Sequence, residues 1–317
     1  MRFVLILFMF LIGCSPAQRT EQAAANRGRE VIIAGRRVVI GAPVVLWTDP
    51  NGYDAYSTEP YFTLTRSSSP AIKQGFEQRI PSDDIKQLIA NRGWTHDTLA
   101  EHIDQIVIHY DAAGTSGRCF EILHDIRGLS AHFLLDVDGT IYQTLDIEER
   151  AWHATTSNNR SIGIEIANIG AYTTDKAGVL NRWYDADATT GARLVFNDTQ
   201  QASLRNPSTH LFSANEDPII GDVQGTLLIQ YDFTPQQYES LSRLVAALCD
   251  ELPLINCDYP RDENGELIDH KLPDAMLEAY QGLIGHFHIQ SNKVDPGPAF
   301  GWDLVVDRAR SYMNSGR

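Results

Sequence analysis

The sequence is short of cysteine and of positive charge, and both shortages exclude classes of protein. Only four cysteines occur in 317 residues, and no two of them have the Cys-x-x-Cys spacing of a cysteine zinc site. Lysine and arginine number 26 against 41 aspartate and glutamate residues, so the formal net charge is −15. Such acidity argues against binding to nucleic acid, or to anionic lipid head groups through a basic patch. We therefore expect no nucleic-acid partner, and no protein partner is predicted.

Long apolar runs are also lacking, apart from one near the N-terminus. Residues 3–12 are apolar without interruption, a stretch too short for a mature membrane-spanning helix. One charge before this run and a small residue after it are typical of a secretory signal. The Leu-Ile-Gly that precedes Cys14 resembles a bacterial lipobox, which would make Cys14 the lipidated first residue of the mature protein. An ordinary signal with a chance cysteine is the alternative.

The signal prediction divides the chain and places it in the cell. Because Ser15 rather than aspartate follows the cysteine, we expect a lipid anchor in the outer membrane of a bacterial envelope, facing the periplasm. The sequence contains no internal repeat. The expected segments are a lipoprotein signal at 1–14, a flexible tether at 15–30, an N-terminal extension at 31–80 packed on the domain, and one enzyme-sized domain at 81–317 with insertions at about 173–232 and 257–271.

The cysteines other than Cys14 are Cys119, Cys249 and Cys257. Their odd number leaves at least one thiol unpaired within the monomer. Cys249 and Cys257 flank a helix end and a short proline-containing segment, so in an oxidising compartment they could form a local disulfide. Three inert buried thiols are the alternative.

Apolar periodicity predicts an α/β domain, in which helices flank a central mixed β-sheet. Residues 105–110 are a β-branched run, typical of a central strand buried on both faces. Residues 131–145 indicate a hairpin that turns at Asp138-Gly139. In a strand expected at 161–167, Glu165 points away from the isoleucine side. Helices are expected at about 82–93, 120–128, 234–248 and 302–313.

The stretch at 285–298 brings two imidazoles, one ammonium and one carboxylate together within ten residues. The Pro-Gly-Pro at 296–298 forbids regular helix or central strand, so the groups sit on a constrained loop. A catalytic zinc site usually has three protein ligands and one open position for water. The loop is therefore half of a metal site. Its four groups are His286, His288, Lys293 and Asp295.

His109, at the end of the strand predicted at 105–110, is the candidate for the distant ligand. A lone histidine at a strand end is more often a hydrogen-bonded core residue than a ligand. Together with the downstream loop, however, it completes a set. His109, His286 and Asp295 supply the imidazole nitrogens and the carboxylate oxygen that zinc binds at ~2.0–2.2 Å.

Six ordered motifs occupy most of residues 105–300. They are Ile-Val-Ile-His-Tyr at 106–110, Ser-Ala-His-Phe-Leu at 130–134, Asp-Gly-Thr-Ile-Tyr-Gln at 138–143, Arg-Ala-Trp-His-Ala at 150–154, Ser-Ile-Gly-Ile-Glu at 161–165, and Gly-His at 285–286 with Lys-Val-Asp-Pro-Gly at 293–297. Together they resemble the zinc-dependent N-acetylmuramoyl-L-alanine amidases of type 2, which are related to phage lysozyme-type amidases and animal peptidoglycan recognition proteins. Six motifs in the family's order are far more specific than any one alone.

The resemblance implies a fold of the type 2 amidase kind and assigns a role to each group. His109, His286 and Asp295 would hold Zn2+. Glu165 would be the general base, and Lys293 would steady the oxyanion. The implied reaction is hydrolysis of the amide between the lactyl group of N-acetylmuramic acid and L-alanine, so the implied partners are peptidoglycan or muropeptides.

Aromatic and imidazole groups outside the ligand set indicate a substrate groove. Trp152 and His153 are expected to line it, because an aromatic face suits a sugar ring and an imidazole can bond a carbonyl or a carboxylate. A plain core position is the alternative for Trp152. His132 is expected to orient its neighbours from the sheet. The histidines without a motif default to structure or surface: His96, His102, His124, His210 and His270.

One feature departs from the family pattern. The loop between His286 and Asp295 is one residue shorter than in these amidases, which makes His288 a possible substitute ligand. His286 remains the expected ligand, because Gly285-His286 matches the family and residues 287–292 can absorb a deletion.

Two other functions are compatible with these motifs. A peptidoglycan-binding lipoprotein or sensor would keep the groove without hydrolysis, although family members that only bind typically lack a ligand. A zinc amidase or peptidase with another substrate would use the same site, since the groove walls come from the two insertions.

Overall fold

A computed structural model describes residues 26–62, 73–187, 191–207 and 210–315. Cys14, the predicted signal and most of the predicted tether lie outside these residues. Within them, no helix combines the length and the apolar character that crossing a membrane requires.

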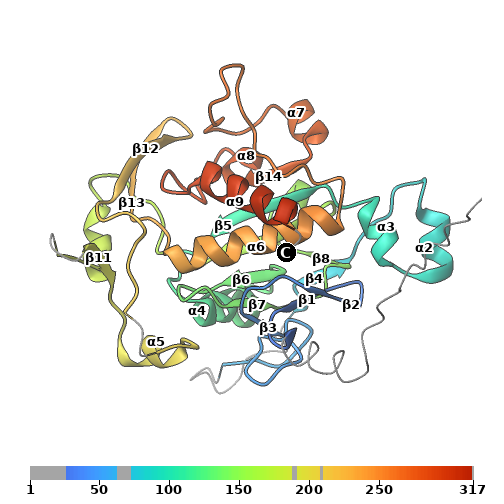
Figure 1. Cartoon of the computed structure of the whole chain (residues 1–317), viewed down its shortest axis with the longest axis horizontal. Coiled ribbons are helices and arrows are strands. Elements are labelled where there is room, and N and C mark those ends of the chain that lie inside the picture. The colour runs from blue at the N-terminus through green and yellow to red at the C-terminus, as the bar shows by residue number, and fades with distance from the viewer. Residues whose placement is uncertain (1–25, 63–72, 188–190, 208–209, 316–317) are drawn as a thin grey trace, which may run out of the picture.

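A six-stranded mixed β-sheet forms the centre of the fold, with strand order β14-β5-β9-β6-β7-β3 (Figure 1). The first four of these strands run parallel to one another, whereas β7 runs antiparallel to β6 and parallel to β3. This arrangement confirms the predicted mixed sheet. The strands are β3 (Val44–Leu46), β5 (Gln105–Tyr110), β6 (Phe133–Leu135), β7 (Ile141–Gln143), β9 (Ser161–Ile166) and β14 (Gly282–Gly285).

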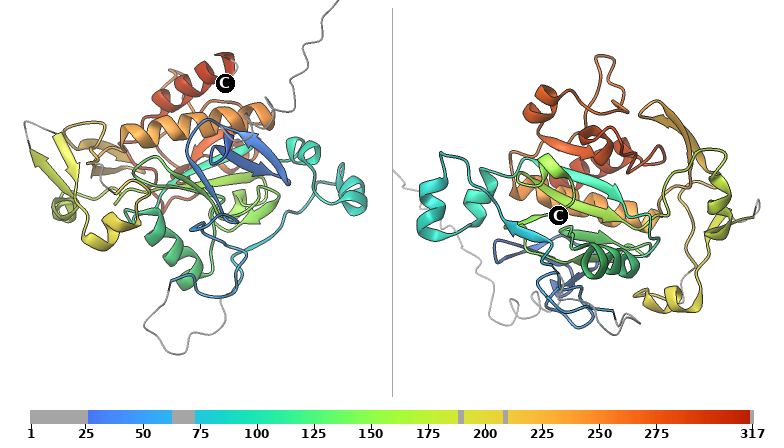
Figure 2. Two further views of the ribbon diagram at one scale, coloured as in Figure 1. Left: turned by 60° about the horizontal axis from the view of Figure 1, so that its bottom comes forward. Right: turned by 180° about the vertical axis from the view of Figure 1, so that it is seen from behind.

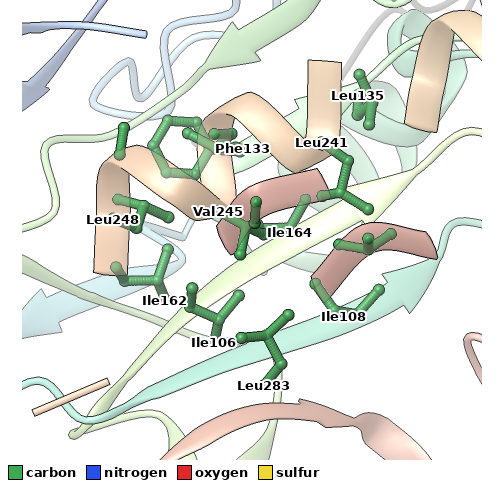
Figure 3. Packing of buried hydrophobic residues seen from close by; sticks show 14 of the residues in the cluster. Ile106, Ile108, Phe133, Leu135, Ile162, Ile164, Leu241, Val245, Leu248 and Leu283 are labelled. Atoms are coloured by element: carbon green, nitrogen blue, oxygen red, sulfur yellow. The ribbon is translucent and has the colours of Figure 1, made fainter. Parts of the chain in front are cut away.

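One face of the sheet packs on α6 (Pro235–Glu251), and α9 (Trp302–Ser315) packs on α6 in turn (Figures 1 and 2). The helix α6 begins where the sequence predicts. Its start is fixed by the Thr234 side chain, which accepts a hydrogen bond from the Gln237 amide, and by a proline in the first turn. Figure 3 shows the resulting core. Its labelled residues are Ile106, Ile108, Phe133, Leu135, Ile162, Ile164, Leu241, Val245, Leu248 and Leu283.

The strand register decides which side chains meet on the opposite face. His109 of β5 is the direct partner of Glu165 on β9. On its other side, β5 pairs with β14, whose last residue, Gly285, leads directly into His286. Because alternate residues of a strand point to opposite faces, His109 and Glu165 face away from α6. The carboxyl ends of the parallel strands β14, β5 and β9 thus bring His286, His109 and Glu165 to the same edge of the sheet.

The segment before β5 adds strands in three places. β1 (Glu30–Ile33) and β2 (Arg36–Val39) form a hairpin, and β3 joins the edge of the central sheet. β4 (Phe76–Gln78) pairs antiparallel with β8 (Glu149–Ala151), directly before Trp152. This pairing puts the segment beside the expected groove.

The stretch at 173–232, expected to be irregular, contains two hairpins. They are β10 (Tyr184–Asp187) with β11 (Gly191–Leu194), and β12 (Ile219–Val223) with β13 (Thr226–Gln230). The second hairpin turns through Gln224 and Gly225, both of which have positive φ, as a two-residue type I′ turn requires. Its short strands carry no sustained apolar alternation, so the sequence pattern did not reveal them.

The remaining helices are short. The helix expected at 120–128 is α4 (Ser116–Phe120), which continues as a π-helix, η1 (Glu121–Arg127), and ends at Gly128 with positive φ. The others are α2 (Lys86–Arg92), α3 (His96–Ala100), η2 (Thr155–Ser157), η3 (Ala177–Arg182), α5 (Asp198–Ser203), α7 (Asp274–Ala279) and α8 (His286–Ile289).

Candidate metal centre and active site

The three predicted metal ligands lie together at the carboxyl end of the parallel strands. His109 Nδ1 is 2.8 Å from Asp295 Oδ2, and His286 Nδ1 is 3.0 Å from the same oxygen. All three residues are buried, and one ligand atom of each lies within 4.8 Å of the others. In the described part of the chain, no other group of three or more histidine, cysteine or acidic side chains is arranged in this way.

Each histidine of the cluster is oriented through its second ring nitrogen. His109 Nε2 is 3.0 Å from His153 Nδ1, and His286 Nε2 is 2.7 Å from Gln290 Oε1. Such contacts fix the direction of a metal-binding imidazole and leave Nδ1 facing the ligand position. His153 itself fits only because Gly163 lacks a side chain, since a Cβ there would lie 2.6 Å from the His153 ring.

The pKa shifts of His109 and Asp295 suit a cation site. Burial, followed by the nearby charge of His286, lowers the pKa of His109 to about 4. Burial alone would raise the pKa of Asp295, but hydrogen bonds from His109 and His286 hold that pKa below its ordinary value. Metal ligands must be deprotonated. Two imidazoles and one carboxylate on one buried side of a cavity therefore fit a zinc ion.

Glu165 and Lys293 line the same cavity as the three ligands, a space of about 360 Å³. Burial raises the pKa of Glu165 well above its ordinary value, and the negative charges of Asp295 and Asp111 raise it further. Lys293 is half-buried on the loop between His286 and Asp295. The site thus combines a candidate cation position, a carboxyl group of raised pKa and an ammonium group.

Trp152 and His153 line this cavity and also a neighbouring one of about 560 Å³. The Lys73 ammonium lies 5.0 Å from the centre of the Trp152 ring. Arg127 and Lys293 line both cavities, and the positive charges of both act on Glu165. A groove rich in cations therefore runs beside the cluster of an otherwise acidic protein.

His288, the possible substitute ligand, and His132, expected to orient its neighbours, both bond backbone groups. His288 accepts a hydrogen bond from the Gly285 amide at Nδ1 and lies 2.6 Å from the Ile268 carbonyl oxygen at Nε2. His132 accepts from the Gly163 amide at Nδ1 and contacts the Glu149 carbonyl at Nε2. Both rings are fully buried, and neither belongs to the metal-binding group.

Several groups around the site were not identified from the sequence. Arg79, 2% exposed, donates hydrogen bonds to the carbonyl groups of residues 147, 158, 159 and 161, and so braces the segment that carries Trp152 and His153. Asp111 Oδ1 accepts from the amides of Ala113 and Gly114 and orders the loop after β5. The Asp-x-x-Gly at 111–114 was the one sequence signal for this turn.

Cys119, Cys249 and Cys257 are free thiols. Hydrogen bonding to Cys249 lowers the pKa of the Cys257 thiol. The disulfide between them stays a prediction for an oxidising compartment.

The chain was compared with curated proteins, with solved structures and with protein-family models. No curated protein matches the chain. Among solved structures, a Se-Met derivative of AmpD is 19% identical, with a TM-score of 0.31, over 74% of this chain and 93% of that one. The amidase AmiD from E. coli, in complex with anhydro-N-acetylmuramic acid-L-Ala-D-gamma-Glu-L-Lys, is 18% identical, with a TM-score of 0.37, over 65% of this chain and 57% of that one.

AmpDh3 from Pseudomonas aeruginosa, in complex with anhydromuramic pentapeptide, is 18% identical, with a TM-score of 0.37, over 65% of this chain and 59% of that one. The family model Amidase_2, described as N-acetylmuramoyl-L-alanine amidase, matches residues 99–298. This match covers more than half of the sequence and includes all three members of the buried cluster. The chain therefore belongs to the N-acetylmuramoyl-L-alanine amidase family.

Proposed function

We propose that this protein is a zinc hydrolase that cleaves the amide between N-acetylmuramic acid and L-alanine in peptidoglycan or its fragments. The observation that carries the proposal is the buried cluster of His109, His286 and Asp295, with Glu165 and Lys293 on the same cavity. Membership of the amidase family supplies the reaction class.

The residues of the site suit amide hydrolysis. Zinc held by the cluster would lower the pKa of a bound water toward ~7 and polarise the substrate carbonyl. Glu165 would take the proton from this water and pass it to the leaving amine. Lys293 would place positive charge beside the oxyanion that develops on the carbonyl oxygen. These two residues are the proposed catalytic residues.

The groove beside the cluster suits a substrate that carries both sugar and carboxylate groups. Trp152 offers an aromatic face, and His153 contacts His109 while lining the groove. Arg127 and Lys73 add positive charge in a protein whose formal net charge is −15. Stem peptides carry free carboxylates, so this local charge favours their binding.

The main alternative is a peptidoglycan-binding lipoprotein that performs no hydrolysis. The complete set of ligand, base and oxyanion-facing groups argues against it, because binding alone needs none of them. For the cellular role, we infer an outer-membrane lipoprotein that faces the periplasm and acts in cell-wall turnover or recycling. The lipobox-like sequence before Cys14 supports this location.

Incubation of the purified protein with intact peptidoglycan and with anhydromuropeptides, read by mass spectrometry, tests the proposal. Zinc-loaded protein should release free stem peptide from at least one substrate, and a chelator should abolish the release. Glu165→Gln should keep zinc and lose about 100-fold or more of the rate, since general base catalysis contributes ~10²–10⁴-fold. Absence of stem peptide with zinc-loaded wild type would favour the binding protein.

A further inference from the structure

The loop that carries two metal ligands has little regular structure of its own. Between His286 and Asp295 it contains only the four-residue α8 and a turn, in which the Lys293 amide donates to the Gln290 carbonyl. Within the described residues, the β12–β13 hairpin supplies side chains that hold this loop from outside. The hairpin lies in the stretch at 173–232, whose role the sequence did not reveal.

Gln224, at the tip of this hairpin, contacts the loop at three points. Its Nε2 donates to the carbonyl oxygens of Phe287 at 2.8 Å, Gln290 at 3.0 Å and Lys293 at 3.3 Å. These carbonyls span nearly the whole distance between the two ligands along the chain. One amide group with two hydrogens thus ties both ends of α8 and the following turn together.

The remaining polar groups of Gln224 fix the residue itself. Its Oε1 accepts from the Lys271 amide at 3.1 Å, and its backbone amide donates to the Asp269 carbonyl at 3.0 Å. Because both ends of the side-chain amide are engaged, the orientation of the donor toward the loop is determined. Gln224 is therefore a junction between the hairpin, the segment at 269–271 and the ligand loop.

The backbone at Gln224 shows that the side chain, rather than the turn, requires glutamine. Its φ is +58°, a conformation that glycine or asparagine adopts more readily. Asn-Gly is the sequence that a two-residue type I′ turn prefers. An asparagine here would suit the turn better, but its amide would be one methylene short of the three carbonyls.

We propose that Gln224 is a positioning residue for the metal centre. By fixing the backbone between His286 and Asp295, it holds both side chains toward His109 and keeps Lys293 on the cavity. Gln230, on the same hairpin, supports the end of the loop, since it donates to the Pro296 carbonyl and accepts from the Ala299 amide, both at 3.1 Å. This inference rests on the proposed metal site.

Two substitutions of Gln224 separate positioning from folding. Gln224→Asn keeps an amide and suits positive φ, but it does not reach the loop. Gln224→Met keeps the length of the side chain, but it cannot donate a hydrogen bond. A matched control is Gln143→Met, because Gln143 is a buried glutamine whose amide likewise bonds backbone carbonyls, those of Ile32 and Leu145, away from the cluster.

Zinc affinity, measured by competition with a chromogenic chelator, is the primary readout, alongside the Tm of the metal-free proteins. Both Gln224 variants should bind zinc about 10- to 100-fold more weakly than wild type, which is the usual effect of losing an outer partner of a metal site. Both variants should fold, and Gln224→Asn should lose less of the metal-free Tm than Gln224→Met, because asparagine suits the positive φ. Gln143→Met should lower the Tm and leave zinc affinity unchanged.

Three results would contradict the role of Gln224 as a positioning residue. Wild-type zinc affinity in either folded Gln224 variant would show that the hydrogen bonds of Gln224 do not position the ligands. Failure of both variants to fold, or an equal loss of affinity in Gln143→Met, would show that Gln224 only stabilises the fold. If wild-type protein itself bound no zinc, the proposed metal site would fail, and that result is distinct from the others.

Discussion

At the scale of single residues, contacts at the second ring nitrogen of His109 and of His286 orient the two imidazoles. His109 reaches His153, and His286 reaches Gln290, so each ring has one nitrogen fixed and one facing Asp295. The contact between His109 and His153 could not be read from spacing. His153 lies 44 positions from His109, and its place depends on the missing side chain of Gly163. The candidate ligands could be predicted from motifs, whereas the contact between His109 and His153 required the folded chain.

The different surroundings of His286 and His288 lead to opposite expectations for their removal. His286→Ala should lose zinc binding, because one of the three ligands is gone. His288→Ala should retain zinc and lose about 1–3 kcal/mol of folding free energy, since the Gly285 amide and the Ile268 carbonyl would be left unpaired. Zinc content by elemental mass spectrometry and Tm by calorimetry measure the two effects. Zinc retained by His286→Ala would refute the ligand assignment.

At the scale of elements, the parts with long periodic patterns were predictable. The continuous apolar run of β5 and the apolar periodicity of α6 each indicated the element and its approximate bounds. The hairpins at 184–194 and 219–230 were not found, because strands of four or five residues with mixed polarity look like loops. The helix expected at about 82–93 begins only after Ile85, as α2, and has no side-chain cap.

The same limit applies to the contacts that complete the site. Gln224 lies 63 positions from Phe287, and Arg79 lies 68 positions from Ile147. Both side chains bond backbone carbonyl groups. Every residue has such a group, so the identity of the accepting residue does not indicate the contact. A sequence pattern therefore indicates the candidate ligands and the proposed catalytic residues, whereas the distant side chains that hold their backbone are seen only in the fold.

The loop after β6 contains a carboxyl group that makes stability depend on pH. Asp136 is 1% exposed, its Oδ2 has no hydrogen-bond partner, and burial raises its pKa to about 8, with a further contribution from the charge of Asp138. In the unfolded chain this carboxyl ionises near pH ~3.9. Between these two values the folded state binds a proton that the unfolded state has released. The contribution of protonated Asp136 to the free energy of unfolding is therefore complete below pH ~4, and it is lost as the pH rises toward 8.

Asp136→Asn should remove this loss, because asparagine is neutral at every pH and keeps an oxygen for the Val137 amide. We expect the variant to gain at least about 1 kcal/mol over wild type at pH 8, or about 2–4 °C in Tm. The gain should be smaller at pH 5. Thermal unfolding at both values measures the difference. An equal shift at the two pH values would mean that ionisation of Asp136 is not its cause.

At the scale of the whole molecule, charge and location have to be considered together. With a formal net charge of −15, the protein is repelled by anionic membrane surfaces, and the cations described above are gathered around the groove. The overall charge therefore provides no electrostatic attraction to an anionic membrane surface. The proposed lipid on Cys14 would have to supply all of the membrane binding, through burial of its acyl chains.

Fractionation of cells that express the wild type and Cys14→Ser tests this expectation. Wild-type protein should sediment with outer membranes and stay there in high salt, because a hydrophobic anchor is insensitive to screening whereas an electrostatic one is not. Cys14→Ser should shift most of the protein to the soluble fraction or leave it unprocessed, while the purified domain keeps its amidase activity, since the cluster lies far along the chain. Membrane-bound Cys14→Ser, or release of the wild type by salt, would show that something other than this lipid holds the acidic domain at the membrane.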